Sequence, residues 1–219
     1  MRDDFLTITT DLLRDDRDRV SDPQLGRALD LALAQYGKDR PRKIVRDETL
    51  ATASRLDWPA DGNVSAIEYP IGNIPPSFLA RQNWQRYDTP DGAELIFPGG
   101  LPSGTTIRLT ILAAHLLTAE TDTVPEADRE AVASYAAALL FDQMSADTSG
   151  DGNPLIMADA VQHGTKPDNY ARRAERLRAR YFDILGLDPK RTRPASVTVP
   201  QPTAASDGGR RVTQRRPRL

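Results

Sequence analysis

The sequence predicts an α+β protein that is mainly helical: a helical bundle with a small antiparallel β insert and a long, extended basic C-terminal tail. Three stretches repeat apolar residues at helical spacing, the middle of the chain alternates with a period of two, and residues 187–219 hold five prolines and no aromatic residue. Residues 1–186 should therefore form one domain, with the β insert at about 64–111, and residues 187–219 should form the tail.

The first strong helix is expected over residues 23–36. Ser21 or Asp22 can cap its free amides, Gly37 suits the left-handed residue after its end, and Pro41 stops any continuation. Its apolar residues share one face, namely Leu25, Ala28, Leu29, Ala32, Leu33 and Tyr36. A short additional helix is expected before it, around Phe5, Ile8, Leu12 and Leu13.

The middle of the chain carries strand signals. Over residues 105–111, Ile107, Leu109 and Ile111 alternate with polar residues, as a strand with one buried face requires. Residues 67–71 alternate in the same way around Pro70, which favours an edge position or a bulge. Residues 84–88 and 93–97 flank the turn sequence TPDG and predict a hairpin, and residues 44–56 add one more strand.

Two further helices follow, over residues 125–145 and 167–185. Thr123 and Glu126 are spaced as a capping box for the first, and Thr165 and Gly186 suit the start and stop of the second. The first helix has an apolar stripe and a flank of small residues that lets a neighbouring helix approach, namely Ala133, Ser134, Ala137 and Ala138. The second has an apolar stripe through Tyr170 and Tyr181 and a basic surface of Arg172, Arg173, Arg176, Arg178 and Arg180.

The residue inventory argues against catalysis. The chain has no cysteine and two histidines, so thiolate sites and Cys nucleophiles are excluded, and we expect no enzyme activity, no cofactor and no metal. His115 and His163 lack a partner acid at a motif spacing and are expected to be structural. Residues 147–153 begin like a calcium-binding loop, but Ala158 stands where a bidentate glutamate is needed.

Two more expectations concern packing and location. The aromatic residues Trp58, Trp84, Tyr87 and Phe97 gather in the β insert, where core packing explains them better than base stacking. No run approaches the length of a membrane span, and the first residues lack the order of a secretory signal. We therefore expect an intracellular protein with no membrane partner.

Charge is distributed unevenly along the chain. Residues 1–165 hold 15 Lys and Arg against 26 Asp and Glu, whereas residues 166–219 hold 14 against 5. Residues 187–219 cannot bury enough apolar area to offset their ordering entropy, so this tail should be disordered when free. Its cations can neutralise DNA phosphates. Alternatively, they can bind an acidic protein surface, with Val197 and Val199 added as a strand to the partner's sheet. In a third alternative, the tail binds no partner and only keeps the protein soluble.

The order of these motifs resembles the head-tail connector, or head-completion adaptor, proteins of long-tailed bacteriophages and gene transfer agents. The resemblance spans roughly residues 20–186 and rests on packing and turn signatures. They are AQYGKDRP at 34–41, IEYP at 67–70, LIF at 95–97, the strand running into His115, VP at 124–125, AVASYAA at 131–137, and a last helix with Tyr170, RA at 173–174 and Tyr181.

The resemblance implies a structural virion protein, made in the bacterial host cytoplasm, that assembles at the head-tail interface as a ring of about twelve copies. Its implied partners are the portal protein, the next neck, stopper or tail protein, and, transiently, DNA in the channel during ejection. Protomer packing is implied for Ala133, Tyr135 and Ala137. Portal binding is implied for tail residues, namely Arg191, Arg193, Val197, Val199, Arg210, Arg211, Arg215 and Arg216.

A second hypothesis remains open beside the adaptor. The basic helix surface from Arg172 to Arg180, together with the tail, also suits a nucleic-acid-binding accessory protein without sequence readout.

Overall fold

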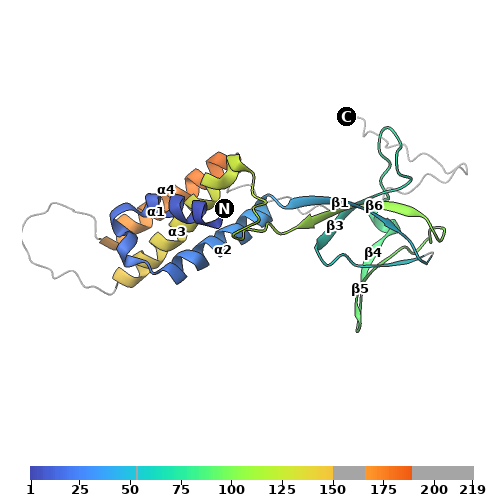
Figure 1. Ribbon diagram of the computed structural model, residues 1–219, viewed down its shortest axis with the longest axis horizontal. Coiled ribbons are helices and arrows are strands. Elements are labelled where there is room, and N and C mark those ends of the chain that lie inside the picture. Colours follow the sequence, from blue (N-terminus) through green and yellow to red (C-terminus); the bar gives the residue numbers. More distant parts are fainter. Residues whose placement is uncertain (53, 150–165, 189–219) are drawn as a thin grey trace, which may run out of the picture. The chain divides into compact units, whose positions relative to one another are not determined.

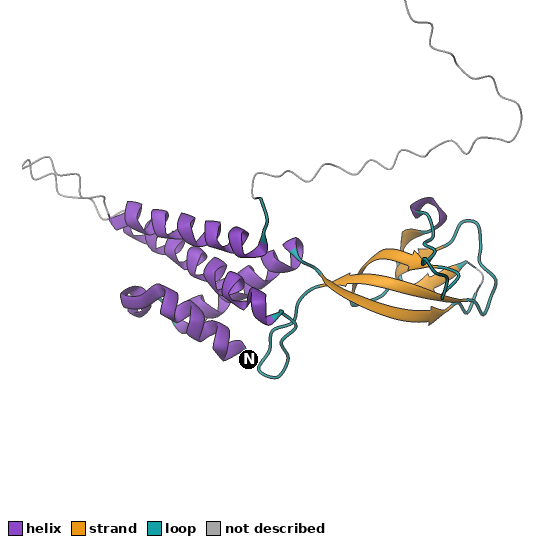
Figure 2. Cartoon of the chain, turned by 90° about the horizontal axis from the view of Figure 1, so that it is seen from above, coloured by secondary structure: helices purple, strands orange, loops and turns teal. Residues whose placement is uncertain are grey.

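The α+β, mainly helical fold is confirmed by the computed structural model, which describes residues 1–52, 54–149 and 166–188 (Figure 1). The chain divides after Leu187, so the first unit, Met1–Leu187, ends one residue after the expected boundary at 186. Within the first unit, the helices, purple in Figure 2, and the strands, orange, build two separate cores.

In the part of the chain that the structure describes, four helices form the bundle. They are α1 (Arg2–Leu13), α2 (Asp22–Asp39), α3 (Arg129–Thr148) and α4 (Lys166–Leu185), with the short 3₁₀ helices η1 (Arg14–Arg19) and η3 (Glu126–Asp128). Helix α3 is central, because α1, α2 and α4 all pack against it. Its residues 131–138 are buried apart from the half-buried Tyr135, as expected of a helix that is surrounded on every side.

The small residues of α3 make this close packing possible. Ala131, Ala133, Ala136, Ala137 and Ala138 are all 0% exposed within the single chain. The small-residue flank that suggested a contact between protomers is thus occupied by the protein's own helices. The implied protomer-packing role of Ala133 and Ala137 stays a prediction, and in the single chain both side chains are buried against the protein's own helices.

We expect the substitution Ala137→Leu to lower the free energy of unfolding by about 1–3 kcal/mol, because the added carbons must displace packed neighbours. Urea denaturation of the purified chain measures this loss. Ala80→Leu, at an exposed position before β4, is the control and should change stability by less than about 0.5 kcal/mol. Equal stability of the two variants would show that α3 has open space on this side.

Among the described residues, six strands form two antiparallel sheets. One has the order β1 (Arg42–Thr49), β6 (Thr106–Ala113) and β3 (Gly62–Glu68), and the other has the order β2 (Arg55–Asp57), β5 (Gly92–Ile96) and β4 (Gln85–Thr89). The predicted alternation of β6 is confirmed, since Ile107, Leu109 and Ile111 are fully buried. Both sheets contribute to one core, which also contains Trp84 and Phe97.

Two expectations about helix ends are wrong. Gly37 lies inside α2, which continues to Asp39 with Arg40 as its C-cap, because Tyr36 and Arg40 are both held by Asp128. Thr123 does not cap α3: its hydroxyl accepts the backbone N–H of Leu116, and α3 begins after η3 with Asp128 as its N-cap. The first strand starts at Arg42 and overlaps the additional strand expected over residues 44–56, which lies before the start given for the insert, about 64.

Other expectations about the elements are confirmed. Ser21 is the N-cap of α2, and the Gln24 side chain accepts hydrogen bonds from the Ser21 backbone and hydroxyl. The hairpin of β4 and β5 closes at the predicted turn, and Gly186 follows α4 with a φ of 63°. Strand β3 lies at a sheet edge with an irregularity between Val64 and Ala66, and it ends before Pro70.

Candidate functional site

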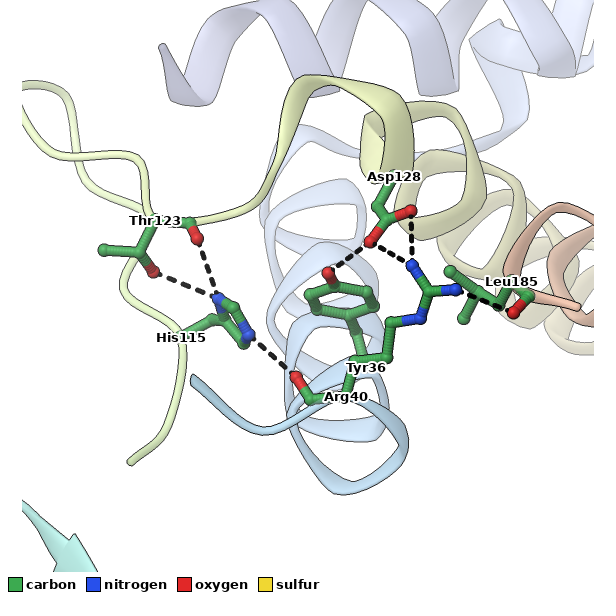
Figure 3. A network of polar contacts seen from close by, with 6 residues as sticks. All are labelled: Tyr36, Arg40, His115, Thr123, Asp128 and Leu185. Atoms are coloured by element: carbon green, nitrogen blue, oxygen red, sulfur yellow. Dashed lines mark hydrogen bonds and ion pairs between the residues drawn. The ribbon is translucent and has the colours of Figure 1, made fainter. Parts of the chain in front are cut away.

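A polar network of buried side chains and the exposed Arg40 gathers at one end of the bundle (Figure 3). We call it the bundle-end network. It joins the end of α2, the segment after β6, η3 and the end of α4, so it lies where the chain leaves the bundle for the strands and where it returns. Its members are Tyr36, Arg40, His115, Thr123, Asp128 and the carbonyl group of Leu185.

Asp128 is the centre of this network. Its side chain is only 6% exposed and accepts a hydrogen bond from the Tyr36 hydroxyl at 2.6 Å and two from Arg40 Nη1 at 3.0 and 2.8 Å. Arg40 Nη2 also donates to the Leu185 carbonyl oxygen at 2.8 Å. The buried carboxylate therefore has a charged partner and a neutral one, which offsets its desolvation, and Arg40 bridges α2 to the last turn of α4.

His115 fixes the segment after β6 to the same end of α2. Its Nε2 lies 2.8 Å from the Arg40 carbonyl oxygen. Its Nδ1 lies 3.0 Å from the Thr123 carbonyl oxygen and 3.2 Å from the Thr123 hydroxyl, and the ring packs on Tyr36 with centroids 4.8 Å apart. The expectation that His115 is structural agrees with these contacts.

Two further tyrosines bind carboxylates in the bundle. Tyr170 of α4 donates to Asp16 of η1 at 2.9 Å, and Tyr181 of α4 donates to Asp39 of α2 at 2.7 Å. Together with Tyr36 and Asp128, these contacts make three Tyr–Asp hydrogen bonds, each between different elements. Burial, and then the carboxylate that accepts each bond, raise the pKa of all three tyrosines above the usual 10.0.

This arrangement predicts alkaline unfolding. A raised pKa means that the folded state holds the tyrosine proton more tightly, so this contribution is complete below about pH 10 and is lost as the pH rises above that value. We expect the urea midpoint to stay level up to about pH 10 and to be lower at about pH 11.5. Tyr36→Phe should be less stable at neutral pH yet show a shallower fall, and an equal fall would exclude Tyr36 as a source.

The arginines of α4 are partly neutralised by the bundle itself. Arg173 pairs with Asp16, Arg178 with Asp142, and Arg180 with Glu130. Arg173 also lies over the Phe141 ring, 4.2 Å from its centroid. Of the five arginines expected to form a basic surface, Arg172 and Arg176 remain without a carboxylate partner in the described part of the chain.

The residues predicted to bind partners fall into two groups: those of α3 lie in the bundle, and those of the tail lie outside the described residues. Tyr135 is half-buried against Tyr181, with ring centroids 4.9 Å apart, and Ala133 and Ala137 lie inside the bundle. His163, Thr165 and the calcium-like loop from residue 150 onward lie outside the described residues. So do the tail residues expected to bind the portal, namely Arg191, Arg193, Val197, Val199, Arg210, Arg211, Arg215 and Arg216.

Sequence reasoning missed the bundle-end network. The members of its central contacts lie 88 to 145 positions apart, and no spacing rule connects them. One local signal existed, because Tyr36 and Arg40 are four residues apart at a helix end and point to the same side.

The aromatic cluster of the β insert is divided between core and surface. Trp84 and Phe97 are 2% exposed, as core packing predicts, whereas Tyr87 is 50% exposed. Trp84 also lies beneath the Arg81 guanidinium, 3.7 Å from the ring centroid. Tyr87 therefore belongs to the surface of the second sheet and is available for contact.

The described side chains do not assemble a metal site. Within residues 1–52, 54–149 and 166–188, no group of three or more His, Asp or Glu residues is placed to hold an ion. No helix in this part of the chain is both long and apolar enough to cross a membrane. The polar groups of the bundle-end network are engaged with one another, so this site fastens elements together.

No protein-family model matches the chain, and no curated protein matches it.

Proposed function

We propose that this protein is a structural adaptor that forms a ring between the portal and the tail or neck of a phage-like particle and extends the DNA channel. The observation that supports this function best is the bundle-end network, in which buried polar groups fasten the strand insertion point to the last turn of α4. The basic C-terminal stretch begins immediately after that turn. A fixed starting point for a charged stretch suits an assembly protein that must present it to a partner.

Charge separation supports the same proposal. Residues 1–165 hold 15 cations against 26 anions, and an acidic body repels the DNA that passes through a channel. Residues 166–219 hold 14 cations against 5 anions, and an acidic portal surface would attract them. Ordering such a stretch lowers the affinity of each contact, but repetition around a ring raises the overall affinity.

The decisive experiment removes residues 189–219. We expect the truncated chain to keep its fold, because the unit Met1–Leu187 is compact by itself, and to lose association with a matched portal protein. Light scattering of the mixture at moderate salt measures the complex, with the full chain expected to join in a fixed stoichiometry. A full-length variant with Arg210, Arg211, Arg215 and Arg216 changed to glutamine tests whether charge alone accounts for the loss.

The same proteins separate the adaptor from the nucleic-acid alternative. That alternative depends on Arg172 and Arg176, which are exposed, and on the tail. A full chain that ignores the portal yet binds arbitrary duplex DNA, with an affinity that falls steeply with salt, would contradict the adaptor and favour the alternative. Portal association that survives the truncation would show that residues 189–219 are not the contact.

A further inference from the structure

Residues 69–80 form an uncharged loop between β3 and η2 (Arg81–Asn83), which we call the apolar loop. It contains no Lys, Arg, Asp or Glu, although 27% of the chain is charged. Ile74 is 99% exposed and Phe78 is 58% exposed. In Figure 1 this loop, coloured teal, projects from the sheets. Large apolar side chains held out in water with no charge around them indicate a contact surface.

The base of the apolar loop is firmly attached. The Tyr69 N–H donates to the Ser77 carbonyl at 2.9 Å, and the Leu79 N–H donates to the Ile67 carbonyl at 2.8 Å. Glu68 accepts the Gly72 N–H at 3.2 Å, while Tyr69 and Leu79 pack on the core of the sheets. Pro75 and Pro76 restrict the backbone at the tip. A preorganised loop loses little conformational entropy on docking.

The second sheet carries a hollow of about 300 Å³ that suits such a loop. Its apolar lining is Tyr87, Ile96, Phe97 and Pro98, and its polar lining is Ser54, Arg55 and Gln85. Arg55 is paired with Glu94 at 3.2 Å, so covering the hollow leaves no unpaired charge there. Ile74 is not among the lining residues and is almost fully exposed, so the chain does not fill its own hollow.

We propose that the apolar loop of one copy docks into this hollow on a neighbouring copy. The two surfaces are different patches of the same chain, so the contact is head-to-tail, and repetition of such a contact closes into a ring when the rotation allows it. We take the occupant of the hollow to be a second copy of the chain, because every copy carries both the uncharged apolar loop and the hollow of low net charge. This contact rests on the proposed function and gives the ring its interface.

Cysteine cross-linking tests the contact sharply, because the natural chain contains no cysteine. Two single variants of the full chain, Ile74→Cys and Tyr87→Cys, are mixed at high concentration and oxidised. We expect a disulfide-linked heterodimer at least tenfold in excess over homodimers of either variant. The control replaces Tyr87→Cys by Leu31→Cys, an equally exposed position on α2 at 57%, and should give no such excess.

Each other outcome overturns the contact. Homodimers of Ile74→Cys alone would mean that loop meets loop, equal yields with Leu31→Cys would mean unspecific collision, and no cross-link would mean that the surfaces do not meet. As a second measurement, Ile74→Asp should weaken self-association in sedimentation by at least tenfold. Because Ile74 touches solvent, this variant keeps the fold, and an unchanged melting curve verifies that.

Failure of this contact can be told apart from failure of the adaptor. A chain that joins the portal in fixed stoichiometry without the Ile74–Tyr87 cross-link contradicts only the contact. A chain that cross-links as expected but ignores the portal contradicts only the proposed function.

Discussion

Replacement of Asp128 by alanine is expected to lower the free energy of unfolding by about 3 kcal/mol. The Asp128 side chain is 6% exposed, and its removal leaves the Tyr36 hydroxyl and Arg40 Nη1 without their acceptor. The loss is costly mainly because the Tyr36 hydroxyl is left buried without a partner, whereas the Arg40 side chain is 44% exposed and can turn to water. Urea denaturation followed by circular dichroism measures the loss.

The Arg86–Asp88 pair provides a matched control for this prediction. Its Nε–Oδ1 distance is 2.8 Å, equal to the Arg40–Asp128 distance, but the Asp88 side chain is 71% exposed. Asp88→Ala is expected to cost less than about 1 kcal/mol, since solvent screens an exposed pair. If the two variants lost the same stability, burial of Asp128 would not be the source of its contribution.

Phe141→Ala is expected to produce the other large loss, about 3–5 kcal/mol, because it opens a cavity in the bundle. Phe141 is 0% exposed on α3, stacks on Tyr170 of α4 with centroids 6.0 Å apart, and lies under the Arg173 guanidinium. Its removal therefore weakens the contact between α3 and α4 directly. Thermal unfolding of the full chain at neutral pH measures the effect.

Phe78→Ala makes the same chemical change at a 58% exposed position and should leave the monomer within about 0.5 kcal/mol of the natural chain. A small loss in Phe141→Ala would mean that the bundle collapses onto the vacated volume. Such collapse would shift Tyr170, and the absorbance titration of the tyrosines would show it.

Sequence periodicity predicted the elements whose pattern is set by one buried face. Strand β6 alternates because a single face meets the core, and α2 shows its stripe because a single face meets α3. Strand β1 was harder to define because it is an edge strand. Its Ile44 is only half-buried, and most of the residues around it are charged. An edge strand with no fully buried position gives the sequence little alternation to display.

Element ends and the candidate site were less predictable for a different reason. Gly37 and Thr123 have the right local chemistry for a stop and a cap, but tertiary contacts of Asp128 and His115 decide where α2 and α3 end and begin. Such contacts join residues that are far apart in sequence, so no local pattern encodes them. For the buried alanines of α3, the sequence pattern correctly indicated that another helix packs closely against them. The helices that do so in the structure belong to the same chain.

The Arg40–Leu185 hydrogen bond also has a mechanical meaning. A pull on the chain beyond Leu187 acts first on the last turn of α4, whose Leu185 carbonyl is held by Arg40. Arg40 lies two residues before β1, and its own carbonyl is held by His115 after β6. A force applied from the C-terminal side therefore acts through Arg40 on the segment before β1, and through His115 on the segment after β6. These contacts oppose the separation of the end of α4 from the bundle.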